Sequence, residues 1–560
     1  MFFYIFVYPL YLSRQQCVDF SMSVWRKIIL SWWWLFIHRS ILGYKAGDFE
    51  KSKKIIKAGA NFAYQVLPKL IELADAQKNN HIIYKKEPLI QSNAKIKINS
   101  IYVDFASQSK RKKNNLRLET FIKDRISLNT KDSVKFKTIE RSIKRLYGTR
   151  NFFKAYYTLT PLADGSYDFT TKVEPDVKFR FKGALHFDTE IGTGAILNVT
   201  ARNWLGKNSR LVGTLDLAQS PEYRIHYRKY FRHSNFSFNV NFLRTKVVQP
   251  MVFDSEGKAI RDYAVLYRNF GFGLNCNFGI PSSLYIGFIG EINNYQSKYA
   301  NTDVSEKGLS NVNHLQNLNF GLHTQYKFST INRVVFPKKG VDLFIENKVL
   351  ISQGDLNYNR LNYDSLIKST VIAKERLESF GASDKLFFRL TGLIPFNKKI
   401  SMFSTVTSGL IFKYSNESSF MDTVYVAENI RGDGYFVGGA EQRARPNQVP
   451  LIGLKEGQLN PTDGFITLQL GVQFEVYPKL VISPMFNYCY AANSPKELFK
   501  NMPKIDFNNL SKMINETYWN TYTYGINIGY RSVFGPISVN LSKAALYNKW
   551  QVYFTVGYKF

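Results

Sequence analysis

An alternation of apolar and polar residues recurs from about residue 177 to residue 560, and it constrains the fold more than any other feature. The clearest segments are Phe236–Phe242, Gly525–Gly529, Ile537–Ser542 and Gln551–Phe560, in which every second side chain is apolar. Successive side chains of a strand point to opposite faces, so each segment predicts a strand with one apolar face. Short runs rich in Gly, Asn, Ser, Pro and Lys separate the segments, as turns do.

The composition favours a transmembrane β-barrel over a soluble β-sandwich or propeller. Aromatic residues make up 16% of the chain, with 45 Phe and 35 Tyr. The one apolar run, Ile28–Ile37, is too short for a membrane-spanning helix, which needs about 20 residues. Strands of ~10 residues with their turns, over about 380 residues, give about sixteen strands. We therefore expect a mainly β fold with an antiparallel barrel over residues 177–560.

Residues 93–176 predict a small α+β domain. Its strand, helix, helix, strand, strand order follows from Ile96–Phe105, Leu118–Ile126, Ile139–Leu146, Phe152–Leu159 and Tyr167–Val173. Ahead of it, residues 46–92 predict a short helical segment. Residues 1–45 are an apolar and basic N-terminus without a clean secretion signal.

The chain is basic, with 75 Lys and Arg against 43 Asp and Glu. No nucleic-acid-binding motif accompanies this charge, so we expect no nucleic-acid partner. Anionic lipid headgroups and solvated loops are the competing explanations. Lys178, Arg180 and Lys182 alternate with apolar residues, which predicts a basic barrel lumen.

The final strand resembles the C-terminal assembly signal of outer-membrane barrels. It alternates apolar residues at Phe554, Val556 and Tyr558 and ends on the aromatic Phe560. The resemblance implies residence in the outer membrane of a Gram-negative bacterium, contact with its lipids, and recognition by the barrel assembly machinery.

The small domain, with LYGTRNFF at Leu146–Phe153, resembles a POTRA domain. A POTRA before a barrel is similar to the BamA/TamA-like superfamily, also called the bacterial surface antigen family. Asn332–Gly340 resembles that family's N-x-x-F-P-x-x-G pattern, and Gly535–Leu541 resembles its penultimate strand. The resemblance implies a periplasmic POTRA domain that binds a polypeptide client.

One family motif is only partly matched. The family's Arg-Gly-Tyr/Phe motif lies on a loop inside the lumen, where the Arg contacts acidic wall residues. Its nearest match here is Arg431-Gly432-Asp433-Gly434-Tyr435, and the glycine pair Gly438-Gly439 follows the motif instead of preceding it. The resemblance implies a lumen-loop role for Arg431 and Gly432, and the departure leaves open that Arg431 is an ordinary loop residue.

Leu42–Phe49 and Ile55–Ala60 are similar to the last helix region of bacterial patatin-like phospholipases. Patatin hydrolysis needs a G-x-S-x-G nucleophile. Glycines four residues apart bracket Lys45, Phe436, Lys455 and Asn527, and never a serine. We therefore expect no patatin catalysis in this chain, and no metal or cofactor.

Three functions remain open at this point. The first is the membrane-anchoring or translocation module of a patatin-type lipase whose catalytic half is absent. The second is a stand-alone protein translocation or outer-membrane assembly factor. The third is a passive pore that favours anions. A single POTRA argues against a general assembly factor, and the patatin-like helix favours the first function.

Overall fold

The computed structural model describes most of the chain from residue 95 onward. The described residues are 95–105, 112–130, 133–190, 192–231, 235–253, 259–278, 281–297, 311–364, 369–414, 434–439, 447–455, 458, 462–501, 518–532, 535–547 and 549–557, with scattered positions between 56 and 75. The chain divides into two units, Met1–Gln91 and Ser92–Phe560. The scattered positions of the first unit are helical, and the N-terminus 1–45 lies outside the described residues. No helix among the described residues is long and apolar enough to cross a membrane.

The second unit begins with the small domain, residues 95–175. Its elements are β1 (Lys95–Phe105), α3 (Lys112–Ile126), β2 (Ser133–Lys135), α4 (Phe136–Gly148), β3 (Phe152–Pro161) and β4 (Tyr167–Pro175). They form a sheet in the order β2-β1-β4-β3, in which β1 and β4 are parallel. The predicted order of strands and helices is confirmed. The three-residue strand β2 was not predicted, because so short a strand shows no detectable alternation of apolar and polar residues.

The core of the small domain lies between its helices and its sheet. Ile139, Ile143 and Leu146 of α4 are buried, as their helical spacing predicts. They pack in one cluster with Ile98 of β1 and Phe169 of β4, both fully buried. These contacts provide the apolar burial on which a domain of this size depends.

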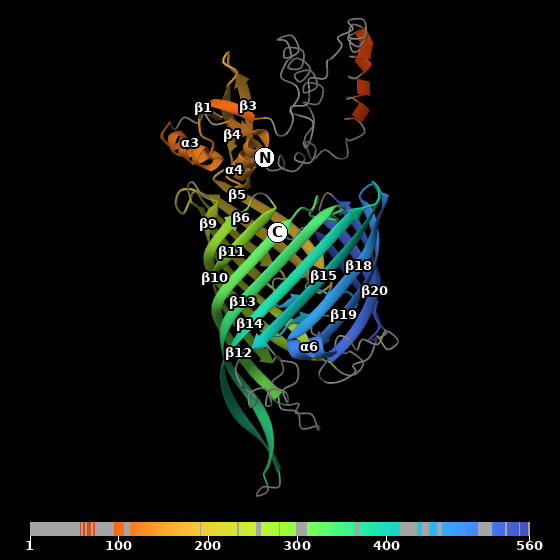
Figure 1. The fold of residues 1–560 in the computed structure, drawn as a ribbon. Coiled ribbons are helices and arrows are strands. Elements are labelled where there is room, and N and C mark those ends of the chain that lie inside the picture. Colours follow the sequence, from red (N-terminus) through yellow and green to blue (C-terminus); the bar gives the residue numbers. More distant parts are fainter. Residues whose placement is uncertain are drawn as a thin grey trace. The chain divides into compact units, whose positions relative to one another are not determined.

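Sixteen antiparallel strands close into a barrel (Figure 1), which confirms the predicted fold class and strand number. The strands are β5 (Phe179–Asp188), β6 (Gly192–Arg202), β7 (Ser209–Leu217), β8 (Glu222–Tyr230), β9 (Phe236–Phe253), β10 (Ala259–Asn277), β11 (Ser282–Ser297), β12 (Asn311–Ser329), β13 (Gly340–Asp364), β14 (Ser369–Pro395), β15 (Ile400–Lys413), β18 (Gly464–Tyr477), β19 (Leu480–Ala492), β20 (Tyr518–Ser532), β21 (Gly535–Ala544) and β22 (Trp550–Gly557).

The two faces of the barrel wall have opposite chemistry. On β10, the side chains of Phe270, Phe272 and Leu274 are exposed on the outer face of the barrel. Asn275, on the inner face of the same strand, is buried. Ile286 and Phe288 continue the outer apolar face on β11. An apolar outer band around a polar interior is the arrangement of a transmembrane barrel.

The strands differ greatly in length around the barrel. β5 to β8 have 9 to 11 residues each. β13 and β14 have 25 and 27 residues, and their hairpin continues past the neighbouring strands (Figure 1). The connection from β15 to β18 carries two short strands, β16 (Phe436–Val437) and β17 (Gln448–Val449), which pair in parallel. A short helix, α6 (Pro495–Asn501), follows β19.

Candidate functional site in the barrel lumen

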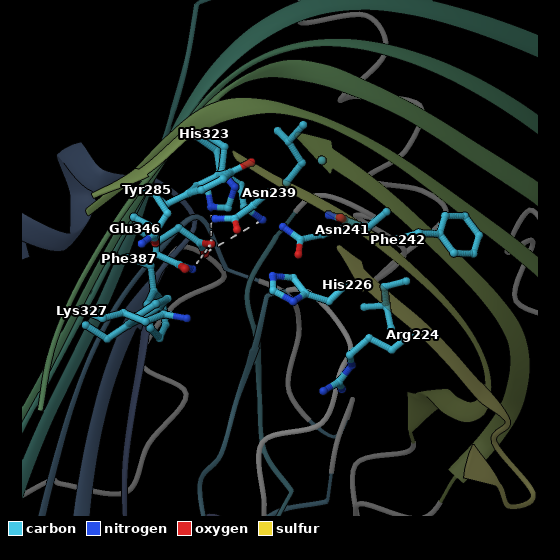
Figure 2. Close-up of a pocket in the computed structure, with 18 of the residues that line it drawn as sticks. Arg224, His226, Asn239, Asn241, Phe242, Tyr285, His323, Lys327, Glu346 and Phe387 are labelled. Atoms are coloured by element: carbon cyan, nitrogen blue, oxygen red, sulfur yellow. Dashed lines mark hydrogen bonds and ion pairs between the residues drawn. The ribbon is translucent and has the colours of Figure 1, made fainter. Parts of the chain in front are cut away.

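A polar cavity of about 640 Å³ lies inside the barrel against β8 to β14. Figure 2 shows side chains from opposite parts of this wall, among them His226, His323, Lys327 and Glu346, pointing into one space. Its cationic lining residues are Arg224, Arg228, Lys327, Lys348 and Lys385. Glu346 is the one carboxylate among the lining residues within the described part of the chain. This part of the lumen is therefore basic, but Lys178, Arg180 and Lys182, on which the prediction of a basic lumen is based, do not line this cavity.

A buried ion-pair network crosses the cavity wall. Lys348 Nζ lies 2.7 Å from Glu291 Oε1 and 4.0 Å from Glu346 Oε2, and the Lys348 and Glu291 side chains are 9% and 2% exposed. His323 Nε2 lies 2.8 Å from Glu346 Oε1, and the Tyr267 hydroxyl donates to Glu291 at 3.3 Å. Each buried charge thus has a partner, without which its desolvation would strongly destabilise the wall.

The connection between β15 and β18 folds back into the lumen. Tyr435 is buried, its ring packs on Phe465 at 5.0 Å between centroids, and its hydroxyl donates to the Leu386 carbonyl at 3.0 Å. Phe436 and Val437 are also buried, in the short ladder of β16 with β17. We call residues 434–439 and 447–455 the lumen insert. Arg431 and Gly432 lie outside the described residues, so their role stays a prediction.

Gly409 of β15 makes room for the lumen insert. A Cβ atom at Gly409 would overlap the Phe465 ring and lie 2.7 Å from the Tyr435 ring. The inner wall is therefore hollowed at this glycine, and the aromatic pair fills the hollow.

The stretch Asn332–Gly340 covers part of one mouth of the barrel. Phe336 adopts a positive φ of 48° and packs against Gly529 of β20, several strands away around the wall. Lys338 Nζ donates to the Lys398 carbonyl at 2.6 Å and pairs with Glu475. The turn therefore ties β12 and β13 to three other hairpins of the same rim.

The barrel closes where β22 meets β5, the last and the first of its strands. In the described residues its pairs are Thr555 with Asp188, Val556 with Phe187 and Gly557 with His186. The amide of Thr189 also donates to the Phe554 carbonyl at 3.1 Å.

The predicted assembly-signal residues lie partly at this seam. The Phe554 ring packs on Phe187 of β5, with 5.9 Å between the ring centroids. Val556 lies directly opposite the same Phe187. Tyr558 and Phe560 are outside the described residues, so recognition of these four residues by an assembly machine stays a prediction.

The small domain is fastened to the barrel through Arg202 of β6. Its guanidinium pairs with Asp176 at 2.6 Å and donates to the carbonyls of Arg150 at 2.8 Å and Val177 at 3.1 Å. The Arg125 guanidinium of α3 lies over the ring of Tyr230, at the end of β8. Sequence reasoning missed both contacts, because the partners are far apart in the chain.

No group of three His, Cys, Asp or Glu side chains that could hold a metal ion occurs among the described residues. The site is a polar lumen with an inserted segment and a closing seam between β22 and β5. These features define a class: a transmembrane β-barrel preceded by a small α+β domain.

Among solved structures, the fold matches BamA from Haemophilus ducreyi, in a crystal structure lacking POTRA domains 1–3. The TM-score is 0.52 at 15% identity, over 82% of this chain and 84% of that one. CdiB from Acinetobacter baumannii gives 0.47 at 12% identity, over 83% of this chain and 74% of that one. CdiB from Escherichia coli gives 0.42 at 9% identity, over 82% and 76%. No protein-family model matches the chain.

Proposed function

We propose that this protein is an outer-membrane translocation or assembly barrel that handles polypeptides and opens at the β22–β5 seam. The observation that carries the proposal is that the barrel closes between its first and last strands, β5 and β22, which are the neighbours farthest apart in the chain. Neighbours such as β13 and β14, by contrast, follow each other directly in the chain.

The seam between β22 and β5 is held without a connecting turn. Each backbone hydrogen bond contributes about 0.5–1.5 kcal/mol net, and more where water cannot replace it, as inside a bilayer. Because no turn links the ends of β22 and β5, these two strands can separate by breaking their ladder of backbone hydrogen bonds alone. The separated edges carry unpaired N–H and C=O groups, which a strand of another polypeptide can pair with.

The small domain offers a second edge for a polypeptide. β3 lies at the edge of its sheet, and Phe153 and Tyr156 on it are half exposed. An extended client segment can add to such an edge through main-chain hydrogen bonds while its side chains contact the two aromatics. This supports a periplasmic client bound by a POTRA-like domain.

The experiment is a cross-linking test of the seam in lipid vesicles. Cys17, Cys276 and Cys489 are first replaced by alanine. Val556 and Phe187, which lie opposite each other across the seam, are then each replaced by cysteine. Vesicles with the reduced protein should insert a urea-unfolded outer-membrane barrel faster than empty vesicles, and oxidation should abolish the gain.

A matched control places the cysteines at Val539 and Phe554, which lie opposite each other across β21 and β22. Oxidation of that pair should leave the insertion rate unchanged. No acceleration by the reduced protein would overturn the proposal. An anion-selective conductance that the seam cross-link leaves intact, without any effect on insertion, would favour the passive pore.

The finer proposal is that the barrel is the membrane module of a patatin-type lipase. It is supported by the likeness of Leu42–Phe49 and Ile55–Ala60 to the end of a patatin domain. Sequencing the DNA upstream of the codon for Met1 tests it. A neighbouring frame that encodes G-x-S-x-G supports the lipase link, and a secretion signal with no lipase frame favours a stand-alone barrel.

A further inference from the structure

Three arginines lie side by side on the inner wall at β6, β7 and β8. Arg202 is directly opposite Arg210, and Arg210 is directly opposite Arg228. Side chains directly opposite each other in antiparallel strands start from Cβ atoms about 4.5–5.5 Å apart, and like charges there are destabilising. Negative charge near this row of three guanidinium groups would therefore stabilise the wall.

The nearest carboxylate is already shared between two other contacts. Asp176 Oδ1 pairs with Arg180 at 2.5 Å, and Asp176 Oδ2 pairs with Arg202 at 2.6 Å. Both oxygens of Asp176 are thus engaged, and one negative charge faces two guanidinium groups. Asp176 therefore does not supply a carboxylate oxygen to Arg210 or Arg228.

Arg210 and Arg228 have no carboxylate partner among the described residues. The Nε of Arg210 is shielded from solvent and has no hydrogen-bond acceptor there. Three cations, Arg150, Arg202 and Arg228, act electrostatically on Arg210, together with the phenol group of Tyr230. Arg228 Nε donates to the neutral amide oxygen of Asn239 at 2.8 Å.

Space for a ligand adjoins Arg228, the member of the pair that lines the lumen cavity. Arg228, His226 and Arg224 follow one another on the inner face of β8, and all three line the lumen cavity. Figure 2 shows His226 and Arg224 on this side of the cavity, with the amide of Asn241 beside the imidazole. A small ion in the cavity can therefore reach Arg228 from the lumen.

We propose that Arg210 and Arg228, flanked by Arg150 and His226, form an oxyanion site that binds a phosphate group. The planar guanidinium fork matches phosphate oxygens with two parallel hydrogen bonds, and two adjacent arginines can hold one tetrahedral anion between them. The bound phosphate offsets the like charges of the row. Free phosphate and a lipid phosphate share this chemistry. The site does not depend on the proposed function.

The test uses the full-length protein in neutral detergent micelles. Inorganic phosphate is titrated against chloride at matched ionic strength, and a second series adds phosphatidylglycerol to the micelles. Binding is followed by calorimetry and by the shift in Tm. Phosphate should raise Tm, and Arg210→Gln or Arg228→Gln should weaken phosphate binding by about tenfold or more, as for a lost charge-assisted hydrogen bond.

Both variants should fold, because each removes a repelling charge from the row, and Tm without phosphate should rise. The control is Lys229→Gln, which removes one charge from the exposed residue beside Arg228, and it should keep native affinity. Stabilisation by phosphatidylglycerol alone, lost in both arginine variants, assigns the site to a lipid phosphate. No Tm shift from either source, or an equal shift in the variants and the native protein, would overturn the proposal.

Discussion

At the scale of single residues, the inner wall depends on the buried ion pair between Lys348 and Glu291. Their side chains are 9% and 2% exposed, and 2.7 Å separates Nζ from Oε1. Replacing Lys348 by Met leaves the Glu291 carboxylate buried without its cation, so we expect a loss of about 3–5 kcal/mol in the free energy of unfolding. Denaturant titration of the refolded barrel in detergent measures it.

A second substitution separates lost charge pairing from lost packing. In the double variant Glu291→Gln, Lys348→Met the unpaired charge is gone, so most of the stability should return. The exposed Lys229→Met is the control and should change little. A double variant as unstable as Lys348→Met alone would show that the pair matters through packing and not through charge.

At the scale of elements, the lumen insert depends on the hollow at Gly409. A methyl group there overlaps the Phe465 ring and crowds Tyr435, so Gly409→Ala should cost about 1–3 kcal/mol by overpacking. Gly392→Ala on β14 is the matched control, because no atom lies within 4 Å of its would-be Cβ. The Tm of each variant in detergent is the measurement. Equal Tm values for the two would mean that the insert does not pack on this wall.

The same scale shows what the sequence can and cannot predict. Alternation at Phe236–Phe242 and Ile537–Ser542 predicts strands that the structure contains as parts of β9 and β21, because adjacent residues of a strand point to opposite faces. Glu346 and Lys348 could be assigned to an inner face by their i, i+2 spacing. Their partners His323 and Glu291 come from other strands, and only the register of the closed barrel brings them together.

At the scale of the whole molecule, the barrel wall is uneven. β9 to β15 are long strands, whereas β5 to β8 have 9 to 11 residues each, and the barrel closes between β22 and β5 without a connecting turn. Proteins open locally where their elements are least tied to the rest of the structure. We therefore expect opening to start at this seam.

Hydrogen exchange of the protein in lipid vesicles, followed by mass spectrometry, tests that claim most directly. Peptides from Trp550–Gly557 and Phe179–Asp188 should exchange about tenfold or more faster than peptides from Gly464–Tyr477 and Leu480–Ala492, which pair with each other along most of their length. Equal protection of the two sets would contradict a wall that opens between β22 and β5.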